Sequence, residues 1–194
     1  MTCVGDESDA ARDDQALVAR VLLADDRRAF EQLLRRHQGM VRAQLRRLVR
    51  GNLAEADDLA QETFLLAWRK LDQFRGEARF STWLYRIAYS CFLQARRKQG
   101  PGAEHQPVDL HEPQNWPDDR ADRRLDVERA VQSLSAPEQA VLLHVAQLGL
   151  SHEEAAYVLG MPLGTVKSHA RRGQARLRVL LADWNVIADK EFGR

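Results

Sequence analysis

The chain has 194 residues, of which 44% are hydrophobic and 29% are charged, and this length allows one domain or two small ones. It contains no run of about 18 apolar residues, which excludes a membrane-spanning helix. The start of the chain, residues 1–14, is acidic and polar and does not resemble a signal peptide. We therefore expect a cytoplasmic protein without direct membrane insertion. Two cysteines are too few for a disulfide framework or a thiolate metal site.

The formal net charge of +1 conceals an uneven distribution of charge along the chain. Residues 30–98 carry a net charge of +7 and residues 129–182 carry +3, whereas the stretch 99–128 carries −5. A surface that meets nucleic acid phosphates requires a concentration of positive charge. The sequence therefore predicts two basic blocks that are separated by an acidic one.

Two amphipathic helices are predicted at the start of the chain. The first is expected to be short, and its apolar residues are Leu17, Val18, Val21 and Leu22. Asp25 or Asp26 is placed to cap the second, which ends at Gly51-Asn52. The apolar stripe of the second is Phe30, Leu33, Leu34, Val41, Leu45 and Leu48. Six arginines between residues 35 and 50 cover much of its other surface, and a solvated face is the simpler interpretation of them.

A third helix is predicted over residues 54–71. Its core stripe is Ala56, Ala60, Thr63, Phe64, Ala67 and Leu71. The opposite side carries Asp58, Gln61, Glu62, Leu65 and Arg69, with Trp68 at its flank. An exposed leucine and tryptophan among carboxylates are unusual on a solvated surface. They are typical of a protein-binding face, in which apolar anchors are surrounded by polar groups.

A fourth helix is predicted over residues 82–98, after the connector Asp72–Gly76 breaks the third. Its expected buried stripe is Leu84, Ala88, Cys91, Phe92 and Ala95. The face expected to point outward holds Tyr85, Arg86, Tyr89, Leu93, Arg96 and Arg97. Arginines meet phosphates and aromatic rings stack on unpaired bases, so this face suits nucleic acid. A face that is only solvated is the alternative.

Residues 99–122 differ in composition from the helices on either side. They hold Gly100-Pro101-Gly102, three further prolines and several acids, and they show no apolar period. This predicts a flexible acidic linker between a helical domain over 10–98 and a second domain over 123–182, which a tail over 183–194 follows. His105 and His111 lie in this stretch without ligand partners at metal spacing, so we expect no metal and no cofactor.

The second basic block predicts a helix-turn-helix. Ser135–Glu138 and Ser151–Glu154 form capping boxes, and Gly149 and Gly160 end the helices that these boxes begin. A longer helix begins near Leu163, with a buried stripe at Val166, Ala170, Gly173, Leu177 and Leu180. A glycine inside a helix costs about 1 kcal/mol relative to alanine. Its presence in the stripe therefore suggests that another helix crosses closely.

The longer helix is the expected recognition helix of this motif. Its outward residues are Thr165, Lys167, Ser168, Arg171, Arg172 and Arg176. Those near its N-terminal end are placed to reach base edges in a major groove, and the others are placed to meet phosphates. A helical hairpin without a DNA role is the alternative, but the turn, the caps and the basic face all favour the helix-turn-helix.

Two runs of the sequence resemble the extracytoplasmic-function (ECF) sigma factors of bacterial RNA polymerase. The first is Ala56–Trp68, and it is followed by Phe74–Gly76 and Phe80–Ala88. The second is Leu150–Ala156 with Gly164–Ser168. Either run alone is only suggestive, because helix-turn-helix motifs occur in many regulators. Both runs in this order, joined by a short linker, are highly specific.

The resemblance implies an all-α chain with sigma region 2 over 10–98 and sigma region 4 over 123–182, which binds core RNA polymerase and directs it to promoter DNA. The residues implied to bind core polymerase are Asp57, Asp58, Gln61, Glu62, Leu65 and Trp68. Those implied to bind the −10 element are Arg75, Phe80, Ser81, Thr82, Trp83, Tyr85, Arg86, Tyr89, Ser90, Leu93, Arg96 and Arg97. Those implied to bind the −35 element are Gly164, Thr165, Lys167, Ser168, His169, Arg171, Arg172 and Arg176. An anti-sigma factor is a further expected partner, and neither catalysis nor a small-molecule substrate is expected.

Several positions depart from the family's pattern. Ser90 and Gln94 stand where Asn and Asp are common, and His169 stands where Arg is common, so the preferred promoter sequence is expected to differ. His169 either contacts DNA or only solvates its helix. A helix-turn-helix regulator that acts without core polymerase is the competing hypothesis, which the exposed face around Leu65 and Trp68 opposes. An enzyme is not supported, because no nucleophile motif, phosphate loop or metal set occurs.

Overall fold

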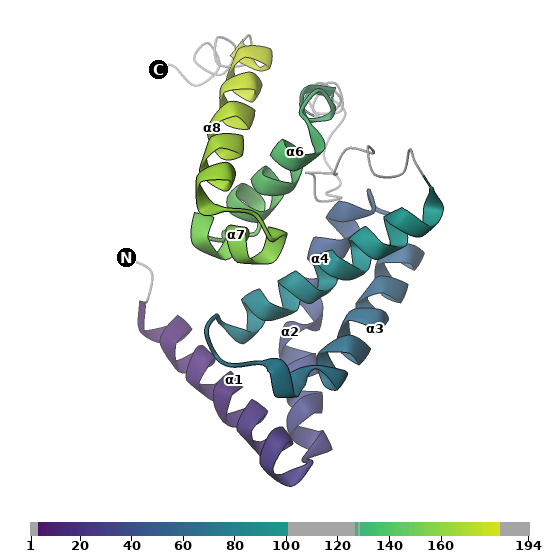
Figure 1. The fold of residues 1–194 in the computed structure, drawn as a ribbon, viewed down its shortest axis with the longest axis vertical. Helices are drawn as coiled ribbons and strands as arrows, with labels where there is room; N and C mark the ends of the chain where they lie inside the picture. Colours follow the sequence, from purple (N-terminus) through teal and green to yellow (C-terminus); the bar gives the residue numbers. More distant parts are fainter. Residues whose placement is uncertain (1–3, 101–126, 128, 183–194) are drawn as a thin grey trace, which may run out of the picture. The chain divides into compact units, whose positions relative to one another are not determined.

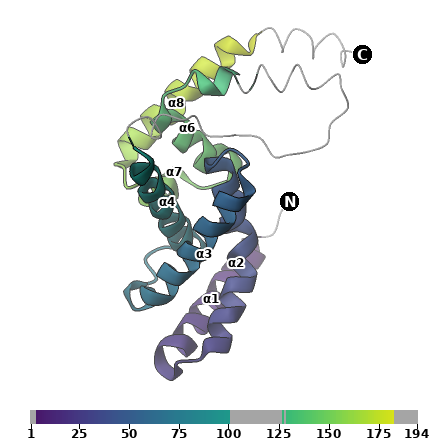
Figure 2. The ribbon, with the colours of Figure 1, turned by 90° about the vertical axis from the view of Figure 1, so that its right-hand side faces the viewer.

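The computed structural model describes residues 4–100, 127 and 129–182, with side chains from residue 11 onward, and this part of the chain is all-α, as predicted (Figures 1 and 2). The elements are α1 (Val4–Ala24), α2 (Arg27–Leu48), α3 (Leu53–Arg69), the 3₁₀ turn η1 (Leu71–Gln73), α4 (Phe80–Gln99), α6 (Ala136–Leu142), the π-helical turn η4 (Leu143–Gln147), α7 (His152–Leu159) and α8 (Leu163–Leu180). The predicted linker over 99–122, apart from its first two residues, and the predicted tail over 183–194 lie outside the described residues.

The chain divides into two compact units. The N-terminal unit takes the residues up to 46 together with 52–95, and the C-terminal unit takes 47–51 and the chain from 96 onward. The helices α1 to α4 belong mainly to the first unit, and α6, α7 and α8 belong to the second.

Side-chain caps set the helix ends of the N-terminal unit. Asp26 Oδ1 accepts a hydrogen bond from Ala29 N at 3.1 Å, so Asp26 rather than Asp25 caps α2. Asn52 Oδ1 accepts from Glu55 N at 3.2 Å and caps α3. Between these helices Arg50 and Gly51 have positive φ, which reverses the chain after Leu48. Leu22 is 48% exposed, although the first apolar stripe predicted it to be buried.

Helix α4 is buried over a wider face than its sequence predicts. The predicted stripe is buried at Leu84, Ala88, Cys91 and Phe92. Tyr85, Tyr89 and Arg96, which were expected to point to solvent, are buried as well, so that expectation is wrong. The period of a single helix shows where its buried face is centred but not how wide that face is, because the width depends on the neighbours that the helix packs against. What stays exposed is a narrow stripe along one side.

The C-terminal unit contains the predicted helix-turn-helix. Capping boxes begin α6 at Ser135 and α7 at Ser151, and Gly160, with a φ of 64°, ends α7 in the left-handed conformation. Helices α6 and α7 both pack on α8, which begins at Leu163 as predicted (Figure 1). The fully buried residues of α8 end at Gly173; of the predicted stripe beyond it, Leu177 is half-buried and Leu180 is 52% exposed.

Gly173 allows α6 to approach α8 closely, as its position in the buried stripe predicted. A Cβ atom at this position would lie 2.9 Å from Leu142 Cδ1 and 3.4 Å from Leu142 Cγ. Leu142 is itself buried, so it has little room to move. The crossing of α6 over α8 therefore depends on the missing side chain.

His144 is a fully buried histidine in the π-helical turn that continues α6. Its Nδ1 lies 2.7 Å from the carbonyl oxygen of Ala140, to which it donates. Burial disfavours the charged imidazolium and lowers the pKa of His144 to about 4, despite the opposing effect of that hydrogen bond. The side chain is therefore neutral at pH 7 and serves as part of the core.

We predict that Gly173→Leu destabilises the C-terminal unit by about 1–3 kcal/mol, because the added side chain overpacks the contact with Leu142. Helix propensity favours leucine over glycine, so a loss of stability cannot come from propensity. Chemical denaturation followed by circular dichroism measures the effect. Gly164→Leu is the control in the same helix, since nothing lies within 4 Å of a Cβ there. Equal stability of the two variants would contradict the packing argument.

We predict that the C-terminal unit loses stability as the pH falls from about 6.5 toward 4, because the unfolded chain protonates His144 before the folded chain does. The contribution is fully present above pH 6.5. At pH 5 the loss from this group is about 2 kcal/mol. Urea unfolding at pH 7 and pH 5, with amide exchange read in α6, compares the wild type with His144→Gln, whose side chain does not titrate. The same pH dependence in both proteins would show that His144 is not the cause.

Candidate functional site

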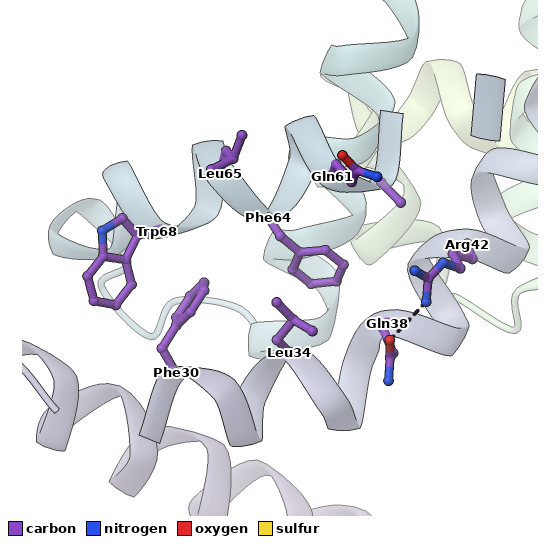
Figure 3. A pocket seen from close by; sticks show the side chains of 9 residues that line it. Phe30, Leu34, Gln38, Arg42, Gln61, Phe64, Leu65 and Trp68 are labelled. Carbon is purple, nitrogen blue, oxygen red and sulfur yellow. Dashed lines mark hydrogen bonds between the residues drawn. The ribbon is translucent and has the colours of Figure 1, made fainter. Parts of the chain in front are cut away.

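An apolar groove runs between α2 and α3 and has a volume of about 450 Å³ (Figure 3). Its lining residues are Phe30, Leu34, Gln38 and Arg42 from α2 and Ala60, Gln61, Phe64, Leu65 and Trp68 from α3. The rings of Phe30 and Trp68 meet edge to face at one end, with centroids 4.8 Å apart. Gln38 and Arg42 lie at the other end (Figure 3). The groove thus combines an apolar floor with polar groups at one end.

The structure brings the residues predicted for protein binding to this groove or beside it. Leu65 is 59% exposed, and Asp58, Gln61 and Glu62 are exposed too, so the outward orientation of this face is confirmed. Trp68 is half-buried because it packs on Phe30. Asp57 is engaged within the chain: its Oδ1 pairs with Arg42 Nε at 3.0 Å and links α3 to α2.

Sequence analysis missed the half of the groove that α2 supplies. Phe30 and Leu34 were assigned to the core of α2, and Arg42 to a solvated face. In the structure Phe30 and Leu34 are half-buried and form one wall, and Arg42 Nη1 donates to Gln38 Oε1 at 2.8 Å. The period of α2 alone does not distinguish a core position from a groove wall. That distinction needs the position of α3.

An aromatic cluster holds the loop that joins η1 to α4. The rings of Phe74 and Phe80, of Phe74 and Trp83, and of Phe80 and Trp83 have centroids 5.4, 5.4 and 5.5 Å apart. Phe80, Thr82 and Trp83 are buried, so in this structure they do not offer the open surfaces that direct contact with a nucleic acid requires. Phe80 and Trp83 are buried because they pack with Phe74 beneath the loop. Arg75, in contrast, is exposed on the loop.

Helix α1 braces the same loop through a buried carboxylate. Asp14 Oδ2 lies 2.7 Å from His37 Nε2, and Asp14 Oδ1 accepts from Arg36 Nη1 at 3.2 Å. The His37 ring in turn contacts the Phe80 ring edge to face, with centroids 5.4 Å apart. Asp14 therefore links α1 and α2, and through His37 it supports the aromatic cluster.

The exposed stripe of α4 is a row of polar and basic side chains. It consists of Arg86, Ser90, Gln94 and Arg97, spaced at three to four residues along one side. Gln94 Nε2 donates to Ser90 Oγ at 3.4 Å, so the two positions of α4 that depart from the family's pattern form one hydrogen-bonded pair. Leu93 is half-buried at its edge. Gln94 was absent from the predicted site, although its spacing from Ser90 could have added it.

The outward face of α8 is basic, as predicted. Gly164, Thr165, Lys167, Arg171, Arg172 and Arg176 are exposed, and Ser168 and His169 are half-buried. Arg172 Nη2 lies 3.1 Å from His169 Nδ1, where the guanidinium donates and the imidazole accepts. The Nδ1 atom of His169 therefore already has a hydrogen-bond partner within α8.

Two families of known proteins match this chain. The Sigma-70 region 2 family matches residues 33–101, and the Sigma-70 region 4 family matches residues 124–177. The chain is 35% identical over 175 residues to the ECF RNA polymerase sigma factor SigM of Mycobacterium tuberculosis, with 89% of this chain and 86% of that protein covered. This chain belongs to the ECF sigma factors of RNA polymerase. The region 2 match covers α3, α4 and most of α2, and the region 4 match covers α6, α7 and most of α8.

Further relatives of this sigma factor support the same family. It is 32% identical over 175 residues to the ECF RNA polymerase sigma-E factor of Haemophilus influenzae, with 83% of this chain and 91% of that protein covered. Among solved structures, it resembles CnrH in complex with the cytosolic domain of CnrY (TM-score 0.63, 27% identity, 88% of this chain and 98% of that chain). It also resembles the sigma factor RpoE in complex with the anti-sigma factor NepR from Bartonella quintana (TM-score 0.61, 29% identity, 79% and 96%).

The described residues contain neither a membrane-spanning helix nor a metal-binding cluster. None of the helices described here has the length and hydropathy needed to cross a membrane. Within the same part of the sigma factor, no group of three or more His, Cys, Asp or Glu side chains is arranged to hold a metal ion.

We predict that Asp14→Asn destabilises the N-terminal unit by about 1–3 kcal/mol, because a neutral amide cannot replace the charge-assisted hydrogen bond from Arg36 and also accept at both of its side-chain atoms. Urea denaturation measures the loss. Asp13→Asn is the matched control: Asp13 also binds Arg36, at 3.1 Å, but its side chain is 64% exposed against 9% for Asp14. Losses of equal size in the two variants would contradict a special role for the buried carboxylate.

Proposed function

We propose that the groove between α2 and α3 is the surface through which this sigma factor binds core RNA polymerase. The observation that carries the proposal is the row of apolar side chains left open along the groove, at Phe64, Leu65 and Trp68, beside exposed Gln61. A large exposed apolar side chain costs free energy in the unbound protein and stabilises a complex that covers it. The carboxylates of Asp58 and Glu62, on the solvent side of α3, supply a polar rim.

For the −10 element we propose that the exposed stripe of α4 and Arg75 make the contacts. Arg86 and Arg97 carry the charge that meets phosphates, and the Ser90–Gln94 pair offers donors and acceptors to base edges. The buried aromatic residues Phe80 and Trp83 act on DNA by shaping the loop rather than by stacking on bases. This division replaces the simpler hypothesis that every aromatic residue of the segment faces DNA.

For the −35 element we propose that α8 lies in the major groove. Gly164, Thr165 and Lys167 are exposed at its N-terminal end, where a recognition helix reaches base edges. Arg172 and Arg176 lie further along the helix and are placed to meet phosphates. Both DNA-binding surfaces are needed for a promoter to be selected by two separated elements.

We infer that this sigma factor has no chemistry of its own and acts in the cytoplasm, where core polymerase and DNA are found. We also propose an anti-sigma factor as a partner. Of the two solved relatives, RpoE is bound to the anti-sigma factor NepR, and CnrH is bound to the cytosolic domain of CnrY. The exposed groove is a surface that an inhibitor could cover in competition with polymerase. The same open groove favours a sigma factor over a regulator that acts without core polymerase.

We predict that Gln61→Ala and Leu65→Ala together weaken binding to purified core RNA polymerase at least about tenfold, which corresponds to about 1.4 kcal/mol. Both side chains are exposed, so the fold is expected to survive. Affinity is measured by titration of labelled protein with core enzyme, and run-off transcription on a genomic promoter library identifies the promoters used.

Leu23→Ala is the control for this experiment, because Leu23 is an exposed leucine on α1 that does not line the groove. It is expected to bind core polymerase as the wild type does. Unchanged affinity in the double variant would rule out the groove as the binding surface. A wild-type protein that binds promoter DNA but not core polymerase would favour the independent regulator instead.

A further inference from the structure

Glu138 is a buried carboxylate that joins the start of α6 to the recognition helix α8. Its side chain is only 4% exposed. Its Oε2 accepts hydrogen bonds from Ser135 N at 3.0 Å, from Ser135 Oγ at 2.9 Å and from Arg176 Nη1 at 3.0 Å. Its Oε1 lies 3.6 Å from Arg172 Nε. Two arginines of the proposed −35 surface thus share one carboxylate inside the domain.

The charge of Glu138 is stable in this environment. Burial by itself would raise the pKa of the carboxyl group, but the hydrogen bonds from Ser135 and the charges of Arg176 and Arg172 outweigh it and lower the pKa. Glu138 is therefore ionised at neutral pH. It also cannot follow its partners toward solvent, because Ser135 holds it at the capping box of α6.

The guanidinium groups of Arg172 and Arg176 contact Glu138 on one side and face solvent on the other. The side chains of Arg172 and Arg176 are 54% and 57% exposed, so each retains N–H groups on the solvent side. A guanidinium has five N–H donors in a fixed plane and can bind a carboxylate and a phosphate at once. Arg172 also donates to His169 on the same helix. The arrangement fixes the direction in which these side chains meet DNA.

We propose that Glu138 is a positioning residue for promoter recognition: it orients Arg172 and Arg176 for phosphate contact and reduces the positive charge that α8 presents to DNA of any sequence. The proposal rests on the proposed function of α8. Phosphate contacts carry most of the sequence-independent affinity of a DNA-binding protein, so partial neutralisation of two cations favours discrimination over tight non-specific binding. Orientation of the remaining donors lowers the entropy lost when the specific complex forms.

The first test is Glu138→Gln in the full chain. The amide keeps the size of the side chain and an oxygen that accepts from Ser135, but it loses the charge that restrains the two arginines. The salt dependence of binding is measured with the chain alone on a mixed-sequence DNA duplex, which requires neither polymerase nor a known promoter. The preference for the −35 element is then measured with the variant bound to core polymerase. Its affinity is compared between a promoter identified by run-off transcription and the same promoter with a scrambled −35 region.

In the variant one compensating negative charge is lost, so the two arginines neutralise about one more phosphate and the slope of log affinity against log salt becomes steeper by about 1. Affinity for the mixed duplex rises severalfold, and the preference for the intact −35 region falls severalfold. A folded variant with the slope and the preference of the wild type would overturn the proposal. Glu154→Gln is the matched control, since Glu154 closes the equivalent capping box of α7 with Ser151 and is expected to change neither quantity.

Arg176→Lys is a second test, and it leaves Glu138 and its hydrogen bonds from Ser135 in place. Lysine keeps the positive charge but loses the planar fork that binds Glu138 and a phosphate together. The salt slope is expected to stay as in the wild type, whereas the preference for the intact −35 region falls severalfold. Wild-type preference in this variant would overturn the positioning role. If the chain failed to bind core polymerase at all, the proposed function would fail, while the salt slope on the mixed duplex would still test the role of Glu138.

Discussion

In each unit of this sigma factor, a buried carboxylate binds basic side chains of another helix. Asp14 of α1 holds His37 and Arg36 of α2, and Glu138 at the start of α6 holds Arg176 and Arg172 of α8. A buried charge of this kind is tolerated only when its partners and hydrogen bonds compensate for the lost water. Each carboxylate therefore links two helices at defined positions.

The apolar packing near these two carboxylates positions the surfaces proposed to bind DNA. In the N-terminal unit the ring of His37 rests on Phe80, and the cluster of Phe74, Phe80 and Trp83 supports a loop that carries Arg75 outside. In the C-terminal unit the absence of a side chain at Gly173 brings α6 against α8. The buried aromatic residues therefore determine where this loop lies.

The two kinds of proposed partner meet different chemistry on this molecule. The groove between α2 and α3 is mainly apolar, with Gln38 and Arg42 at one end, and acidic side chains of α3 border it. The exposed stripe of α4 and the outward face of α8 are basic and polar. The acidic side chains beside the groove repel nucleic acid phosphates, whereas the basic faces attract them. This difference in charge favours binding of polymerase and DNA at separate surfaces.

The sequence by itself determined the helices, the capping boxes of Ser135 and Ser151, the start of α8 and the outward basic residues of that helix, because these features depend on neighbours within a few positions. It also carried the family, through the runs at Ala56–Trp68 and Gly164–Ser168. Only the tertiary structure decided that Tyr85, Tyr89 and Arg96 are buried, that Phe30 and Leu34 form a groove wall, and that Glu138 reaches two arginines. The width of a buried face and the partner of a buried charge are set by other helices, which a periodic pattern within one helix does not specify.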